Sequence, residues 1–298
     1  MRSPTRREFL KGAAVAVGTL SATVGYAWQL EPRWVTLERR RLPIDGLPAA
    51  LEGRTLAQLS DLHVGPLVSD GYIRGVLLDV ARLKPDIVVV TGDWTTWHPG
   101  IVEQAERVYA DLPHGRLATI GVLGNHDYGA HWIDTHNAAR LADMARAAGC
   151  TMLRNEVTEV AGLQVAGMDD LWSSRFDVRR AVRQLDPTRA MLALSHNPDT
   201  VDLDGWDPFH GWILSGHTHG GQVKPPFFAP PLLPVRNKRY TSGTFELGNA
   251  RSLYISRGIG FTLQVRFNAR PEVTLFTLER AQERVSATRS AARRTAAT

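Results

Sequence analysis

The sequence is poor in cysteine and, over its central part, in net charge. Cys150 is the single cysteine among 298 residues, so no disulfide can form within the chain. That absence leaves export open, because many exported bacterial proteins contain no disulfide. The formal net charge is +5, but residues 1–27 and 279–298 carry +3 each, which leaves −1 for residues 28–278. We therefore expect no nucleic-acid partner, since the folded part has no basic excess with which to bind duplex phosphates.

The sequence also lacks a strongly apolar run long enough to be a clear membrane span. Residues 12–28 are apolar but rich in Gly, Ala, Ser and Thr, whereas a full span needs about 20 strongly apolar residues. Residues 5–11, Thr-Arg-Arg-Glu-Phe-Leu-Lys, resemble the twin-arginine export signal, and the small residues at 25–27 suit a signal peptidase. We interpret residues 1–28 as such a signal, either cleaved or retained as an anchor, and exclude them from the fold prediction.

This interpretation predicts that the twin-arginine export machinery is a partner. The protein would then work in the periplasm or on the outer face of the cytoplasmic membrane. The rest of the chain divides into a lead-in segment at 29–52, a main domain at 53–278 and a flexible tail at 279–298. The arginines at 39–41 are expected on a solvated edge, with contact to a membrane surface as the alternative.

The main domain contains a regular alternation of apolar runs and amphipathic segments. Short apolar runs of the kind found in buried strands occur at 55–59, 87–91, 117–123, 190–194 and 212–214. Segments with helical spacing of apolar residues lie at 70–84, 101–112, 135–148 and 177–185. Strands that alternate with helices predict an α/β domain.

Each of these five runs is followed by polar side chains that can bind a metal ion. Ligands of α/β folds sit at the carboxyl ends of the strands, so we expect these side chains to converge on one edge of a sheet. For one run alone, a turn, a helix cap or a core histidine would be the better explanation, but five runs that end alike favour a shared site. The side chains are those of Asp61, His63, Asp93, Asn125, His196, His217 and His219.

The last two of these, His217 and His219, lie in the glycine-rich stretch 215–222. Residues two apart on a strand point to the same side, so both imidazoles are expected to aim at one point. The flanking glycines would allow a backbone or a ligand to approach closely.

The chemistry of the ligand set narrows the choice of metal ion. It contains carboxylates, imidazoles and one amide but no thiolate, which favours manganese, iron or zinc. Seven ligands are too many for one tetrahedral ion and suit two divalent ions, with Asp93 as the bridge. Two cations about 3.5–4 Å apart clamp a phosphoryl group and acidify a bridging water, which attacks phosphorus in line.

In this order the motifs resemble those of the calcineurin-like metallophosphoesterases, and the resemblance covers roughly residues 53–278. It rests on the strings at 61–63, 92–93, 124–127 and 216–219 together with His196. It implies the four-layer metallophosphatase fold, a two-sheet mixed β-sandwich flanked by helices, which spacing alone does not show. It also implies a first metal site of Asp61, His63, Asp93 and His219, a second of Asp93, Asn125, His196 and His217, and a catalytic His126 that protonates the leaving oxygen.

The chain departs from the family at one position. Many phosphoprotein phosphatases have an aspartate three residues after the equivalent of Asp93, where it orients the catalytic histidine. Here that position holds Thr96. Another group, Asp127 or a backbone carbonyl, would then have to orient His126.

Finer strings at 167–170, 195–199, 216–223, 256–260 and 265–272 resemble a bacterial subgroup that is exported or membrane-associated. This subgroup includes phosphodiesterases and UDP-2,3-diacylglucosamine pyrophosphatase-like enzymes of lipid A metabolism. The resemblance implies hydrolysis of a phosphodiester or pyrophosphate bond in a phosphorylated small molecule or lipid. A lipid-phosphate monoesterase, which shares the site, is one alternative, and a non-catalytic surface protein with a vestigial site is another.

Three further features allow either a functional or a purely structural interpretation. Residues 224–233 form a proline-rich apolar loop, which would either dip into a bilayer, cover a lipid substrate, or simply pack. Arg257 and Arg266 would either clamp a phosphate or form surface pairs. Asp170 and Trp172 would either contact substrate or make a turn.

Overall fold

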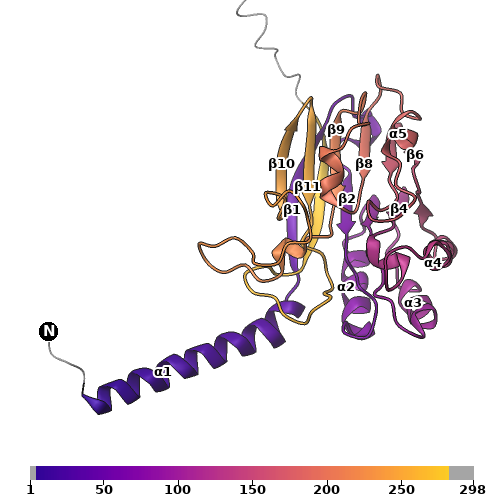
Figure 1. Cartoon of the computed structure of the whole chain (residues 1–298). Coiled ribbons are helices and arrows are strands. Elements are labelled where there is room, and N and C mark those ends of the chain that lie inside the picture. The colour runs from indigo at the N-terminus through magenta and orange to yellow at the C-terminus, as the bar shows by residue number, and fades with distance from the viewer. Residues whose placement is uncertain (1–4, 282–298) are drawn as a thin grey trace, which may run out of the picture.

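Two mixed β-sheets of six strands each form the centre of the protein in the computed structural model, which describes residues 5–281. Helices cover the outer faces of the sheets (Figure 1). This arrangement confirms the predicted α/β class and the two-sheet mixed sandwich that the family resemblance implied.

The first sheet has the order β1-β12-β2-β3-β4-β5. Its neighbours pair in parallel, except that β12 runs antiparallel to β2. The edge strand β1 carries the three arginines at 39–41, all of them exposed as expected. The strands are β1 (Thr36–Ile44), β12 (Glu272–Arg280), β2 (Thr55–Leu59), β3 (Ile87–Thr91), β4 (Ala118–Val122) and β5 (Thr151–Met152).

The second sheet has the order β10-β11-β9-β8-β7-β6. The inner strands are parallel, and an antiparallel hairpin closes each edge. The edge strands β6 and β10 were not predicted, because their half-exposed, alternating residues contain no apolar run. The strands are β10 (Gly243–Gly248), β11 (Arg251–Ile255), β9 (Gly211–Ser215), β8 (Met191–Leu194), β7 (Leu163–Gly167) and β6 (Glu156–Val160).

Three apolar layers hold the sheets and helices together. The central layer lies between the two sheets and is built from their inward-facing side chains, such as Val89 of β3 and Leu214 of β9. The second lies between the first sheet and the helices α2 (Asp70–Arg82), α3 (Ile101–Tyr109) and α4 (Thr135–Ala147). The third packs the short helix α5 (Val178–Val182) on the second sheet. The four predicted helices are therefore present, and the last is shorter than its spacing indicated.

The helix α1 (Arg6–Gly25) stands apart from this body (Figure 1). It starts with a capping box of Thr5 and Glu8, and all its side chains lie outside the packed core of the described chain. It continues through the helical turns η1 (Tyr26–Leu30) and η2 (Glu31–Arg33). By length and composition this helix can cross a membrane, which agrees with either a signal sequence or an anchor.

The predicted boundaries shift slightly at the carboxyl end. β12 extends to Arg280, so the strand continues two residues past the expected domain end at 278. Residues 282–298, which make up most of the predicted tail, lie outside the described residues, as do residues 1–4.

A buried ion pair ties the two sheets together and gives a first prediction. The guanidinium of Arg257, which follows β11, lies 2.8 Å from the carboxylate of Glu272 at the start of β12. The change Arg257→Met should lower the free energy of unfolding by about 3–5 kcal/mol, because it leaves Glu272 buried without its cation. Urea unfolding of the full chain in detergent would measure this.

The matched control is Arg41→Met. Arg41 pairs with Glu279 at 2.6 Å, but its side chain is 81% exposed, so the expected loss is below about 1 kcal/mol. Equal losses for the two variants would contradict the assignment of a structural role to Arg257.

Candidate metal centre

The carboxyl ends of five parallel strands meet at one place. β2, β3 and β4 come from the first sheet, and β8 and β9 from the second, so the expectation of a single sheet edge was wrong in this respect. The loops after the strands are joined across the sheets, since the backbone N–H of His217 donates to the Asp61 carboxylate at 3.0 Å. Within the second sheet, the backbone N–H of Gly216 donates to the carbonyl of His196 at 3.0 Å.

Gly216 allows this close approach, as the glycines of the motif suggested. A Cβ atom at this position would overlap Ser60 Oγ and the Asp61 carboxylate. A residue with any side chain would therefore push the loops of the two sheets apart.

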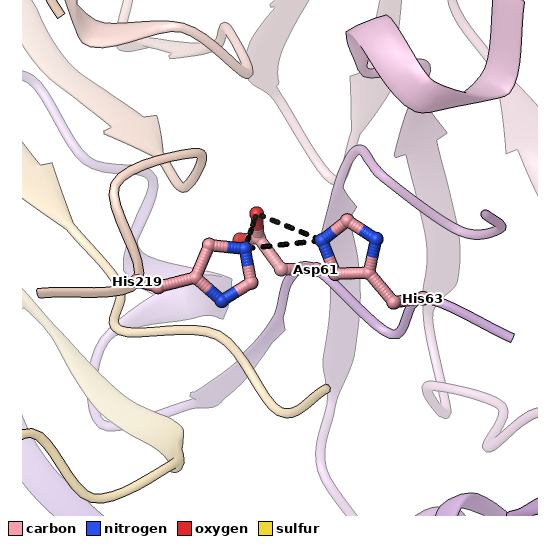
Figure 2. Close-up of side chains that lie close together, drawn as sticks. All are labelled: Asp61, His63 and His219. Atoms are coloured by element: carbon pink, nitrogen blue, oxygen red, sulfur yellow. Dashed lines mark hydrogen bonds and ion pairs between the residues drawn. The ribbon is translucent and has the colours of Figure 1, made fainter. Parts of the chain in front are cut away.

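The first group of side chains consists of Asp61, His63 and His219, which point toward one another (Figure 2). The Nε2 atoms of His63 and His219 are 3.0 Å apart. Asp61 Oδ1 lies 3.4 Å from His219 Nε2 and 3.9 Å from His63 Nε2. All three side chains are buried, so the group is a compact set of potential ligand atoms shielded from water.

The second group consists of Asp93, His196 and His217. Asp93 Oδ2 lies 3.2 Å from His196 Nε2, which lies 3.2 Å from His217 Nδ1. The same oxygen of Asp93 is 3.5 Å from His63 Nε2, in the first group. Asp93 therefore lies between the two groups, as a bridging carboxylate would.

Polar partners hold all four imidazoles in place, and Nδ1 of His219 lies 3.2 Å from the guanidinium of Arg266. The hydroxyl of Thr96 is 2.9 Å from His63 Nδ1, and the carbonyl of Thr91 is 2.8 Å from His196 Nδ1. The carbonyl of Pro234 is 2.8 Å from Nε2 of His217. If each of these ring nitrogens donates its proton to the oxygen, the other nitrogen faces the site with a lone pair, which is the tautomer a metal ligand needs.

The backbone at the site adopts the left-handed region. The φ angles are 52° at Asp61, 50° at His63, 51° at Asp93, 71° at His217 and 50° at His219. Non-glycine residues there cost roughly 1–2 kcal/mol each. Residues in such positions, which are over-determined by their surroundings, are typical of functional sites.

This backbone also corrects the expectation that the imidazoles of His217 and His219 share one side. β9 ends at Ser215, and the chain beyond it no longer follows the two-residue repeat of a strand. His219 consequently joins the first group and His217 the second.

Burial controls the charge of the imidazoles. It lowers the pKa of His63 and of His217 to about 3 and lowers the pKa of His219 well below its usual value. These rings are therefore neutral near pH 7. Burial also opposes protonation of His196, but the carboxylate of Asp93 outweighs it and raises the pKa of His196 to about 10. The positive charge of His196 thus lies beside the negative charge of Asp93.

Asn125 completes the set in a way that fits a cation. It follows β4 and is buried, yet its side-chain oxygen and nitrogen have no hydrogen-bond partner among the described residues. An unpaired buried amide costs free energy, and a cation bound to its oxygen would remove part of that cost. The carboxylate, imidazole and amide donors suit divalent ions such as manganese, iron or zinc.

His126 lies at the edge of this centre and is half-buried. Its ring lies edge-on to that of His63, with centroids 5.0 Å apart, and its backbone N–H donates to Asp93 Oδ1 at 2.9 Å. Asp127 does not orient the ring as suggested, because its carboxylate accepts hydrogen bonds from the backbone N–H groups of Gly124 and Thr95.

Two tryptophans cover the space between the imidazoles. The rings of Trp132 and Trp172 lie 4.8 Å apart. Trp132 also contacts His126, at 5.8 Å between centroids, and Trp172 contacts His217, at 4.7 Å. Trp132 was missed, because nothing in its polar surroundings marks it in the sequence.

The alternatives left open for three other residues are settled by their contacts. Asp170 accepts the backbone N–H of Trp172 at 2.8 Å, which confirms the turn. Arg266 is fully buried, donates to the carbonyls of Gly260 and Ala269 and lies 3.2 Å from Nδ1 of His219, so it neither clamps a phosphate nor forms a surface pair. Arg257 is held by Glu38 and Glu272.

Comparison with known proteins places this geometry in a family. The model of the calcineurin-like phosphoesterases matches residues 54–221. An uncharacterized metallophosphoesterase of Bacillus subtilis, YkuE, is 32% identical over 94% of this chain and 99% of its own length. The phosphodiesterase YaeI of Escherichia coli is 32% identical over 92% of this chain and 99% of its own.

Two more distant similarities are also found. The UDP-2,3-diacylglucosamine pyrophosphatase LpxG of Chlamydia trachomatis is 26% identical over 89% of this chain and 96% of its own. Among solved structures, a dimetal phosphatase from Danio rerio aligns with a TM-score of 0.46 and 12% identity, over 76% of this chain and 99% of that one. From its family match and its relatives, the chain belongs to the calcineurin-like phosphoesterases, which are metal-dependent phosphoric ester hydrolases.

Proposed function

We propose that the protein hydrolyses a phosphodiester or pyrophosphate bond on a lipid or nucleotide-sugar head group. The observation that carries this is the pair of buried ligand groups that meet at Asp93. Asp61, His63, Asp93 and His219 would hold one divalent ion, and Asp93, Asn125, His196 and His217 the other. When bound, these ions would neutralise the phosphoryl oxygens and acidify the attacking water.

The protein's own side chains would complete the reaction. His126 is the half-buried imidazole beside Asp93, and this position supports a role in giving a proton to the leaving oxygen. Trp132 and Trp172 would exclude water from the side that they cover.

The named relatives support a diester or pyrophosphate over a monoester. YaeI is a phosphodiesterase and LpxG a UDP-2,3-diacylglucosamine pyrophosphatase. A lipid-phosphate monoesterase would use the same ligand set, so the choice between the two rests on substrate tests.

We also propose that the twin-arginine machinery exports the protein and that α1 then anchors it to the outer face of the membrane. A signal peptidase cuts an accessible, extended segment. Here Ala27 is buried in a helical turn, and its carbonyl accepts the backbone N–H of Arg266 at 2.9 Å. These contacts favour retention of the helix over its removal.

The first test of the proposed function compares two chromogenic substrates. With Mn²⁺, the full chain in detergent should hydrolyse bis-p-nitrophenyl phosphate, and a chelator should abolish the release of p-nitrophenol. Preference for p-nitrophenyl phosphate would favour the monoesterase. Absence of chelator-sensitive turnover with both substrates would favour the non-catalytic interaction protein.

Asp93→Asn is the sharpest test of the shared ligand. Loss of one bridging carboxylate should lower bound metal below about two ions per chain and reduce turnover by more than about 100-fold. Elemental analysis and the diester assay would measure both effects. The exposed Asp143→Asn serves as the control, and unchanged metal content in Asp93→Asn would contradict the proposed bridge.

His126→Gln should separate chemistry from metal binding. Turnover should fall by about 10²–10⁴-fold, because the proton donor is lost, while the metal content stays the same. The control is His210→Gln, at the opposite end of β9. A variant that loses metal together with activity would make His126 a ligand instead of an acid.

A further inference from the structure

An apolar pocket of about 340 Å³ adjoins the candidate metal centre. His219 lies in its wall, and Pro234, whose carbonyl faces His217, lies there as well. This volume is within the range of small-molecule sites. Most of the remaining wall is aliphatic, from Val223, Leu232, Leu233, Leu263 and Val265.

Two loops form this pocket and are fastened to each other. One follows the metal-ligand motif after β9, and the other connects β11 to β12. The side-chain amide of Gln222 donates to the carbonyl of Leu263 at 2.7 Å. The backbone N–H of Lys224 donates to the carbonyl of Phe267 at 2.8 Å, and an isolated bridge pairs Val223 with Phe267. The pocket is therefore built by the fold.

The outer surface of the same loops is unusually apolar. Phe227 is fully exposed, Phe228 is 73% exposed and Leu232 is 72% exposed. Leu263, on the other loop, is 50% exposed. Large apolar side chains exposed to this extent on neighbouring loops are typical of a surface that contacts another molecule or a membrane.

This surface lies next to the end of the helix that can cross a membrane. Gln264 donates to the carbonyl of Trp28 at 3.3 Å, so the pocket-forming loop is bonded to the end of the helix that can cross a membrane. Trp28 and Leu30 are themselves 45% and 61% exposed. Figure 1 shows α1 leaving the body at the end where the orange and yellow loops project.

We propose that this pocket binds a fatty acyl chain of a membrane lipid whose phosphate lies at the metal centre. This inference rests on the proposed function and makes an acylated phosphodiester or pyrophosphate its substrate class. The chain would pass from the bilayer between the loops that carry Phe227 and Leu263, and its apolar surface would stay out of water throughout.

A second apolar pocket provides the comparison. It is larger, about 560 Å³, and is lined by Trp34, Leu37, Tyr72 and Val76 among others. The seven proposed metal ligands are absent from its described lining, so a chain bound there would not place a phosphate at the site. Leu37, which is 39% exposed, is the matched control for Leu263.

The test compares two diesters that release the same product. The substrates are p-nitrophenyl hexadecyl phosphate and p-nitrophenyl methyl phosphate, used with the full chain in a bile-salt detergent that has no acyl chain. The wild type should favour the hexadecyl diester by at least about tenfold in kcat/KM. Leu263→Glu and Leu232→Glu should remove most of this preference and leave turnover of the methyl diester unchanged, because both side chains are already exposed. Leu37→Glu should keep the preference.

A binding measurement tests the acyl site independently of the proposed phosphodiesterase activity. A hexadecyl phosphate labelled with pyrene should bind the full chain in the presence of chelator, and Leu263→Glu should weaken it by about tenfold or more. Binding without turnover of either diester would overturn the proposed function but uphold the acyl site. Turnover of both diesters at equal rates, or an equal effect of Leu263→Glu and Leu37→Glu, would overturn the acyl site and leave the phosphodiesterase intact.

Discussion

The structure depends on one constraint, which is that several potential metal-ligand atoms are held close together in a site buried from water. The Nε2 atoms of His63 and His219 are 3.0 Å apart, and Asp93 lies within 3.5 Å of imidazoles from both groups. Desolvated carboxylates and neutral imidazoles at such distances are costly unless positive charge lies among them. The proton on His196 supplies part of that positive charge, and the left-handed backbone at the site adds strain. The packed layers on both sides of the two sheets must outweigh this cost.

Two kinds of contact hold the ligand side chains in position. Strand pairing fixes where each loop starts, because β2, β3 and β4 are in register in one sheet and β8 and β9 in the other. Single oxygen atoms then set the orientation of the rings, as Thr91 does for His196 and Thr96 for His63. The threonine found in place of the family's usual aspartate thus supports a candidate ligand instead of the candidate acid.

The site is also connected to the surface where α1 leaves the body. The loop that supplies the Pro234 carbonyl for His217 is the one that walls the apolar pocket and exposes Phe227 and Phe228. One short segment of chain therefore connects the apolar pocket with the candidate centre, and the prolines between 225 and 234 stiffen it.

The sequence by itself determined the family, the α/β class, the buried strands and the residues at their ends. It could do so because the local pattern of apolar, polar and glycine residues indicates which segments are buried and where the chain turns. The two-residue repeat of a strand did not predict the division of His217 and His219 between two groups, which only the family resemblance implied, and no local pattern predicted that both sheets form the site. Those features depend on φ angles after β9 and on contacts between residues more than 150 positions apart, such as His217 with Asp61. The edge strands β6 and β10, the position of Trp132 and the apolar pocket likewise arise only when distant segments pack, since no local periodicity encodes them.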